Sequence, residues 1–122
     1  MNDGSVPRIR PAEIDTNTTP VIDARSHPGK DQIRGALRYD PKALLAADRL
    51  ILPLPEDTGI AVYAEDETRA EEIAQRLRAE GYAKACVLEG GLEAYRESGL
   101  PTEALTEEQP VPGDDRAGIP RI

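Results

Sequence analysis

The sequence predicts an α/β fold, in which a parallel sheet is covered by helices on both faces. Short apolar runs at residues 21–24, 60–63 and 85–88 have the length and the polar flanks of buried strands. Three helical patterns lie between or after these runs: residues 41–51, 68–80 and 92–98. Strands that alternate with helices along a chain usually pair in parallel, because the helix carries the chain back to the same edge of the sheet.

The longest predicted helix covers residues 68–80. Four apolar positions follow the i, i+3, i+4, i+7 spacing of a helix with one buried face: Ala70, Ile73, Ala74 and Leu77. Thr68 and Glu71 form a T-x-x-E capping box, which predicts that the helix begins at Thr68. Gly81 is a favoured residue just beyond a helix end.

Shorter elements surround these. We expect a strand at residues 8–10, a brief helix that begins at Pro11, and a short strand within residues 36–40. Residues 25–35 are expected to form a loop.

The chain is long enough for one domain with a single packed core. We expect this domain to span residues 8–105, after a loose segment at residues 1–7. Residues 106–122 contain three Pro and two Gly with little periodicity, which predicts a mobile tail.

The composition limits the core and the partners. The chain has no Trp and no Phe, so the core is expected to consist of Leu, Ile, Val and Ala. Fifteen Lys and Arg against 23 Asp and Glu give a net charge of −8, which argues against binding to nucleic acid or to an anionic membrane surface. Neither a signal-peptide core nor a membrane-length apolar run is found, so a cytoplasmic protein is expected.

Cys86 is the only cysteine, which excludes an intramolecular disulfide and a multi-cysteine zinc site. Its neighbours Ala85 and Val87 suggest a small buried side chain within a strand. His27 is the only histidine and is expected to be a solvated loop residue.

Three adjacent carboxylates, Glu65, Asp66 and Glu67, follow the strand at residues 60–63. The turn between a strand and the next helix is the usual place for a ligand in α/β proteins. Carboxylates at a helix N-terminus stabilise it by roughly 0.3–1 kcal/mol each, and we expect these three to bind the first free amides of the helix. The spacing lacks the calcium-loop pattern, so no metal and no cofactor are expected.

Four stretches, in this order, resemble the rhodanese family: VIDAR at residues 21–25, QIRGAL at 32–37, IAVYAEDETRA at 60–70 and CVLEGGLEAYRESGLP at 86–101. The resemblance covers residues 9–103. It implies a small rhodanese-like sandwich with four or five parallel strands, helices on both faces, and an active-site loop at the C-terminal edge of the sheet.

The resemblance also assigns a role to each loop position. The family's loop reads Cys-x-x-Gly-x-Arg-Ser/Ala, and its cysteine carries sulfur as a persulfide. Here Ala64 stands in place of the cysteine and Glu67 in place of the glycine, while Arg69 and Ala70 keep the pattern. The former active-site loop is therefore Ala64, Glu65, Asp66, Glu67, Thr68, Arg69 and Ala70. A histidine upstream in the family pattern is replaced by Gln32, and a glycine by Asp31.

These departures predict a catalytically inactive rhodanese-like domain that serves as a protein-recognition or regulatory module. An alanine methyl group cannot carry sulfur, and like charges about 5 Å apart repel a bound anion by on the order of 3 kcal/mol. The expected partner is a protein or basic peptide. The candidate binding residues are Asp23, Arg25, Glu65, Asp66, Glu67 and Arg69.

Two alternatives stay open. The chain is a sulfurtransferase that uses Cys86 or a cysteine supplied by a partner, or it is a structural component of a complex without a ligand of its own. Within the site, we expect Asp23 and Arg25 to form a structural pair. Arg69 is expected to pair with Glu65, Asp66 or Glu72, and the loop with Glu67 in it is expected to follow a relaxed path.

Overall fold

The computed structural model describes residues 6–15, 18–27, 29–47, 52, 54–55 and 57–105. The tail predicted at residues 106–122 and most of the loose segment predicted at residues 1–7 lie outside the described residues.

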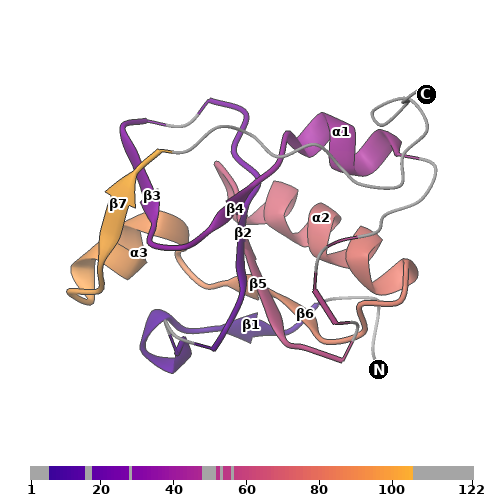
Figure 1. The fold of residues 1–122 in the computed structure, drawn as a ribbon, viewed down its shortest axis with the longest axis horizontal. Helices are drawn as coiled ribbons and strands as arrows, with labels where there is room; N and C mark the ends of the chain where they lie inside the picture. Colours follow the sequence, from indigo (N-terminus) through magenta and orange to yellow (C-terminus); the bar gives the residue numbers. More distant parts are fainter. Residues whose placement is uncertain are drawn as a thin grey trace, which may run out of the picture.

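A five-stranded parallel sheet forms the centre of the domain (Figure 1). The strand order is β1-β6-β5-β2-β4, and every neighbouring pair is parallel. The strands are β1 (Arg8–Ile9), β6 (Ala85–Leu88), β5 (Ile60–Tyr63), β2 (Val21–Asp23) and β4 (Leu37–Arg38). The predicted α/β class and the parallel sheet are confirmed.

Helices cover both faces of this sheet. Helices α1 (Pro41–Ala46) and α2 (Glu67–Ala79) contact each other on one face, and α3 (Gly91–Glu97) contacts the 3₁₀ helix η1 (Pro11–Glu13) on the other (Figure 1). In the described part of the chain, no helix is long and apolar enough to cross a membrane.

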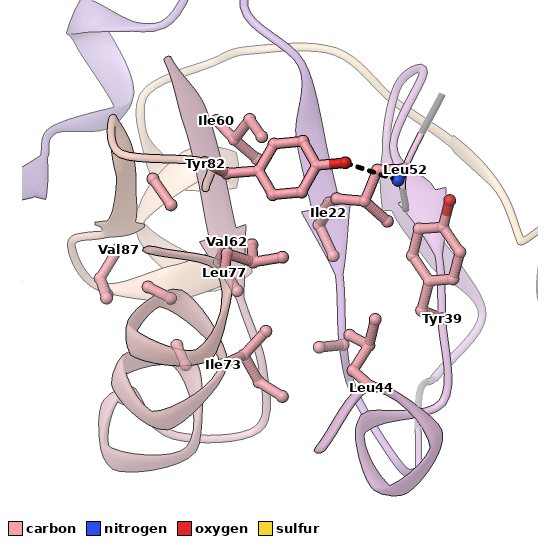
Figure 2. Close-up of a cluster of buried hydrophobic side chains, with 14 of the residues drawn as sticks. Ile22, Tyr39, Leu44, Leu52, Ile60, Val62, Ile73, Leu77, Tyr82 and Val87 are labelled. Carbon is pink, nitrogen blue, oxygen red and sulfur yellow. Dashed lines mark hydrogen bonds between the residues drawn. The ribbon is translucent and has the colours of Figure 1, made fainter. Parts of the chain in front are cut away.

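Strand β5 shows how the two faces are filled. Ile60 and Val62 belong to the hydrophobic cluster beneath α1 and α2, whereas Ala61 and Tyr63 belong to the cluster on the α3 face. Figure 2 shows the first cluster, in which Val62 lies beside α2. Successive strand residues point to opposite faces, so a strand buried on both faces is apolar throughout. This is why the run at residues 60–63 predicted the strand correctly.

The expected composition of the core was incomplete, because tyrosine is also a core residue here. The four tyrosines are all at most 3% exposed: Tyr39, Tyr63, Tyr82 and Tyr95. In a chain without Phe or Trp they supply the aromatic volume, and a buried tyrosine can still satisfy its hydroxyl group. The hydroxyl oxygen of Tyr82 accepts a hydrogen bond from the Leu52 backbone N–H at 2.7 Å (Figure 2).

A second, two-stranded sheet was not predicted. Strand β3 (Asp31–Ile33) lies in the segment expected to be a loop, and it pairs antiparallel with β7 (Thr102–Ala104). Glu103 strengthens this pairing, since its Oε2 accepts hydrogen bonds from Gln32 Nε2 at 2.9 Å and from the Gly35 N–H at 3.0 Å. Each strand has three residues, too few for a local pattern, and each is stabilised by a partner far away in the sequence.

The N-cap residue of helix α2 lies two residues before Thr68, the N-cap residue of the predicted capping box. Asp66 is its N-cap residue, and Asp66 Oδ1 accepts a hydrogen bond from the Arg69 N–H at 2.8 Å. Glu71, the expected partner of Thr68, instead accepts a hydrogen bond from the Val6 N–H at 3.3 Å. Asp is at least as good an N-cap residue as Thr. Local preference therefore does not decide between Asp66 and Thr68 as the N-cap residue, and tertiary contacts such as that of Glu71 do.

We predict that Tyr82→Phe lowers the free energy of unfolding by about 1–3 kcal/mol, because the buried Leu52 N–H loses its hydrogen-bond partner. Urea unfolding measures the change. Tyr95→Phe is the matched control, since Tyr95 is also buried and its hydroxyl has no hydrogen-bond partner within the described ranges. Equal losses in both variants would contradict the assigned role of this hydrogen bond.

Candidate functional site

The candidate site lies at the C-terminal edge of the parallel sheet, where β5 ends and α2 begins. A cavity of about 120 Å³, called here the loop pocket, is lined by Tyr63, Ala64, Glu65, Asp66, Glu67, Ala70, Leu88, Gly90 and Gly91. These residues come from the end of β5, the loop after it and the start of α2, and from the end of β6 and the turn into α3. The two groups meet because β5 and β6 are neighbours in the sheet. The loop pocket is therefore lined by five of the seven residues that the resemblance assigns to the former active-site loop.

A second hollow, called here the outer pocket, adjoins the first and has a volume of about 370 Å³. The two share Ala64, Glu65 and the glycines of the β6–α3 turn. Arg25, His27 and Arg96 add cationic or titratable groups to the outer pocket. Arg96 is already paired there, because its guanidinium contacts the carboxylate of Asp31.

Glu65 binds the loop that follows β2. Its carboxylate accepts hydrogen bonds from the backbone N–H groups of Ser26, at 3.0 Å, and of His27. The imidazole Nδ1 of His27 lies 3.7 Å from the same carboxylate, and the His27 side chain is 92% exposed, as a solvated loop histidine should be. Glu65 thus connects the loop pocket to the segment after β2 instead of capping α2.

Glu67 binds two other segments. Its Oε2 accepts a hydrogen bond from the Gly90 N–H at 2.7 Å, and its Oε1 accepts one from Arg8 Nε at 3.0 Å. The Gly90 hydrogen bond, followed by the interaction with Arg8, lowers the pKa of the Glu67 carboxyl below its ordinary value. Glu67 is the first residue of α2, and no non-glycine residue in the described part of the chain has positive φ.

The expectation that all three carboxylates bind the first amides of α2 was therefore wrong for Glu65 and Glu67. Only Asp66 caps the helix, through the Arg69 N–H. The parallel sheet brings several loops to one edge, and their free amides compete with those of the helix.

Gly90 must be glycine for the site to have this shape. Its φ is +77°, and a Cβ added there would lie 2.5 Å from the Cβ of Ala94. Both the left-handed backbone and the close approach exclude a side chain. The turn that results points the Gly90 N–H at Glu67.

A buried ionic network lies beneath the site. Asp23 is fully buried, and its carboxylate receives three hydrogen bonds from Arg25: the backbone N–H to Oδ1 at 3.1 Å, Nε to Oδ1 at 3.0 Å and Nη2 to Oδ2 at 2.8 Å. The Tyr63 hydroxyl donates to Asp23 Oδ2 at 3.0 Å and accepts from the Ile33 N–H at 3.1 Å. Arg38 Nε lies 3.7 Å from the same Oδ2. The expected structural pair of Asp23 and Arg25 is confirmed.

The network also involves an aromatic contact. The Arg25 guanidinium carbon lies 5.3 Å from the centroid of the Tyr63 ring, within the range of a cation–π interaction. Burial is the main cause that raises the pKa of the Tyr63 hydroxyl, so this group stays a hydrogen-bond donor to Asp23. Tyr63 directly precedes Ala64, so the network fixes the chain just before the pocket.

Two further predicted site residues lie outside the loop pocket. Arg69 pairs with Glu72, one of its three expected partners, with Nη1 and Oε1 3.5 Å apart. Cys86 lies within β6 and lines neither pocket; its thiol donates to the Ile60 carbonyl oxygen at 3.4 Å, and burial raises its pKa.

Sequence reasoning did not find Arg8 or Gly90 as partners of Glu67, nor Tyr63 and Arg38 as partners of Asp23. Among these four residues only Gly90 has a local signal in the sequence, because a Gly-Gly pair directly after a strand is typical of a turn with positive φ. Within the described ranges, no group of three His, Cys, Asp or Glu side chains is arranged to hold a metal ion.

A family model described as the rhodanese-like domain matches residues 11–98 of the chain. No curated protein matches the chain. Among solved structures, a crystal structure of the Alr3790 protein from Anabaena sp. is 28% identical, with a TM-score of 0.63 over 72% of this chain and 69% of that chain. The solution NMR structure of the rhodanese-like domain of Alr3790 is 21% identical, with a TM-score of 0.65 over 95% of this chain and 93% of that one.

Part of thiosulfate sulfurtransferase from Pseudomonas aeruginosa has a similar fold. It is 23% identical, with a TM-score of 0.67, and the alignment covers 81% of this chain but only 20% of the Pseudomonas chain.

We predict that Asp23→Asn lowers the free energy of unfolding by about 3–5 kcal/mol, because it leaves the buried guanidinium of Arg25 without its counter-charge. Chemical denaturation measures the loss, with Asp57→Asn on an exposed residue as the control. A decrease in the free energy of unfolding of less than about 1 kcal/mol, as expected for a surface ion pair, would show that the network does not stabilise this edge of the sheet.

Proposed function

This chain belongs to the rhodanese-like domain family, and we propose that it recognises another protein and does not transfer sulfur. One observation carries the proposal: Ala64, the residue at the nucleophile position of the family pattern, lines the loop pocket. Sulfur transfer of the family's kind needs a thiolate that accepts a sulfane sulfur and passes it on. A methyl group has no lone pair with which to form that bond.

The charge of the loop pocket supports a cationic partner. Its lining includes three carboxylate residues, Glu65, Asp66 and Glu67, and no Lys or Arg. A pocket of about 120 Å³ is also smaller than the roughly 300–1,000 Å³ of typical small-molecule sites. It is suited to the end of a single side chain, so we propose that a Lys or Arg of a partner protein or basic peptide enters it.

The apolar part of the lining is compatible with such a side chain. Ala64, Ala70 and Leu88 offer hydrocarbon surface to the methylene groups of a Lys or Arg. Long cationic side chains commonly bury their stems in this way while the charged end stays near polar groups. The carboxylates around the loop pocket then provide the hydrogen-bond acceptors.

The alternative of a sulfurtransferase that uses Cys86 receives no support from the geometry. The thiol lies within a strand, hydrogen-bonds the Ile60 carbonyl oxygen and has a raised pKa, so little thiolate forms at neutral pH. A cysteine supplied by a partner would meet a pocket whose carboxylates oppose thiolate formation.

We predict that treatment with thiosulfate leaves the intact mass of the wild-type protein unchanged. The variant Ala64→Cys alone should show little sulfur transfer to cyanide, because the pocket carboxylates still repel thiosulfate. Adding Glu65→Gln, Asp66→Asn and Glu67→Gly should increase its turnover. A persulfide on the wild-type protein that disappears in Cys86→Ser would refute the proposed lack of sulfur transfer and would assign the activity to Cys86, the only cysteine of the chain.

We predict that a Lys/Arg-rich peptide binds the wild-type protein and that Glu65→Gln with Glu67→Gln weakens binding by roughly two- to thirtyfold. Fluorescence anisotropy measures the dissociation constants. Asp57→Asn with Glu97→Gln removes the same number of charges at exposed positions away from the loop pocket. Equal weakening in both double variants would show that net charge, and not this pocket, attracts the peptide.

A further inference from the structure

Glu67 joins three segments of the chain at the mouth of the loop pocket. The carboxylate belongs to the first residue of α2, one of its hydrogen-bond donors is in the β6–α3 turn, and the other is in β1. The side chains of Glu67 and Arg8 are 40% and 38% exposed, so the contact lies where a molecule from solvent can reach it.

The two donors form a small anion-binding group. The Gly90 N–H, 2.7 Å from Oε2, is directed at the carboxylate by a backbone turn that only glycine can adopt. Arg8 adds a permanent positive charge with Nε 3.0 Å from Oε1. A backbone N–H and a guanidinium are common ligands of oxyanions, and here they already hold an oxyanion that belongs to the protein.

We propose that Glu67 is an intramolecular ligand that closes the loop pocket to external oxyanions. Its carboxylate occupies the Gly90 N–H and the Arg8 guanidinium, which would otherwise bind a sulfate-like or phosphate-like group. This inference concerns the same pocket as the proposed function but does not depend on it, since it holds whether or not a basic partner exists.

Ala64 and Glu67 affect two different properties of the loop. Ala64 removes the covalent step, because no thiol is present there. Glu67 removes the affinity for an anion, because it competes for the donors and adds a negative charge beside them. A chain that had lost only its nucleophile could still bind an oxyanion, so the two effects can be measured independently.

The test is a titration with sodium sulfate followed by NMR, with sodium chloride at equal ionic strength as the reference. In the wild-type protein the Gly90 amide signal should not move with sulfate beyond its response to chloride. In Glu67→Ala it should move saturably, with sulfate bound at least about tenfold more tightly than by the wild type. Glu97→Ala, which removes one exposed carboxylate from α3, should behave like the wild type.

Glu67→Gln provides a second reading if Glu67→Ala does not fold. The amide keeps the length of the side chain but lacks the charge, so sulfate should displace it from Gly90 more readily than it displaces the carboxylate. Saturable sulfate binding to the wild type at Gly90 would overturn the proposal. A folded Glu67→Ala or Glu67→Gln that binds sulfate no better than Glu97→Ala would overturn it as well. Neither result would bear on the binding of a basic peptide, which is measured separately.

Discussion

The buried carboxylate of Asp23 lies at the centre of a hydrogen-bond network that connects several segments of this domain. A fully buried charge is tolerated only when it is paired and hydrogen-bonded, and Asp23 obtains both from Arg25 and from the Tyr63 hydroxyl. Arg25 also donates from Nη2 to the Asp31 carbonyl oxygen at 2.8 Å, and Tyr63 accepts from the Ile33 N–H. One carboxylate at the end of β2 thereby ties together β2, β5 and β3.

The loop pocket depends on that arrangement. Tyr63 is the last residue of β5, and the chain continues directly into Ala64 and the three carboxylates. Because the Tyr63 ring is held by Asp23 on one side and lies against Arg25, the start of the loop has a fixed direction. Each carboxylate then accepts hydrogen bonds from a different neighbour. Glu65 binds the segment after β2, Asp66 binds the start of α2, and Glu67 binds β1 and the β6–α3 turn.

Sequence reasoning predicted what depends on local patterns. The strand at residues 60–63 and the strand at 85–88 were correct to the residue, since each is an apolar run with polar flanks. It failed where structure depends on distant partners: β3 and β7 stabilise each other, and Arg8 reaches Glu67 across 59 positions. The aromatic core was missed for a different reason: the absence of Phe and Trp was taken to leave only Leu, Ile, Val and Ala, although a tyrosine can also be buried when its hydroxyl group finds a partner.

The contacts of Glu65 and Glu67 have a consequence for how the mouth of the pocket behaves before anything binds. Glu65 connects the β5–α2 loop to the segment after β2, and Glu67 connects the start of α2 to the β6–α3 turn and to β1. These hydrogen bonds restrict the motion of the connected segments relative to one another. Immobilising a loop on association costs conformational entropy, and a rim that is already preorganised avoids most of that cost. A molecule that binds at this edge of the sheet therefore meets a surface whose shape and charge are already set. Molecules that match this surface bind without first rearranging the loops.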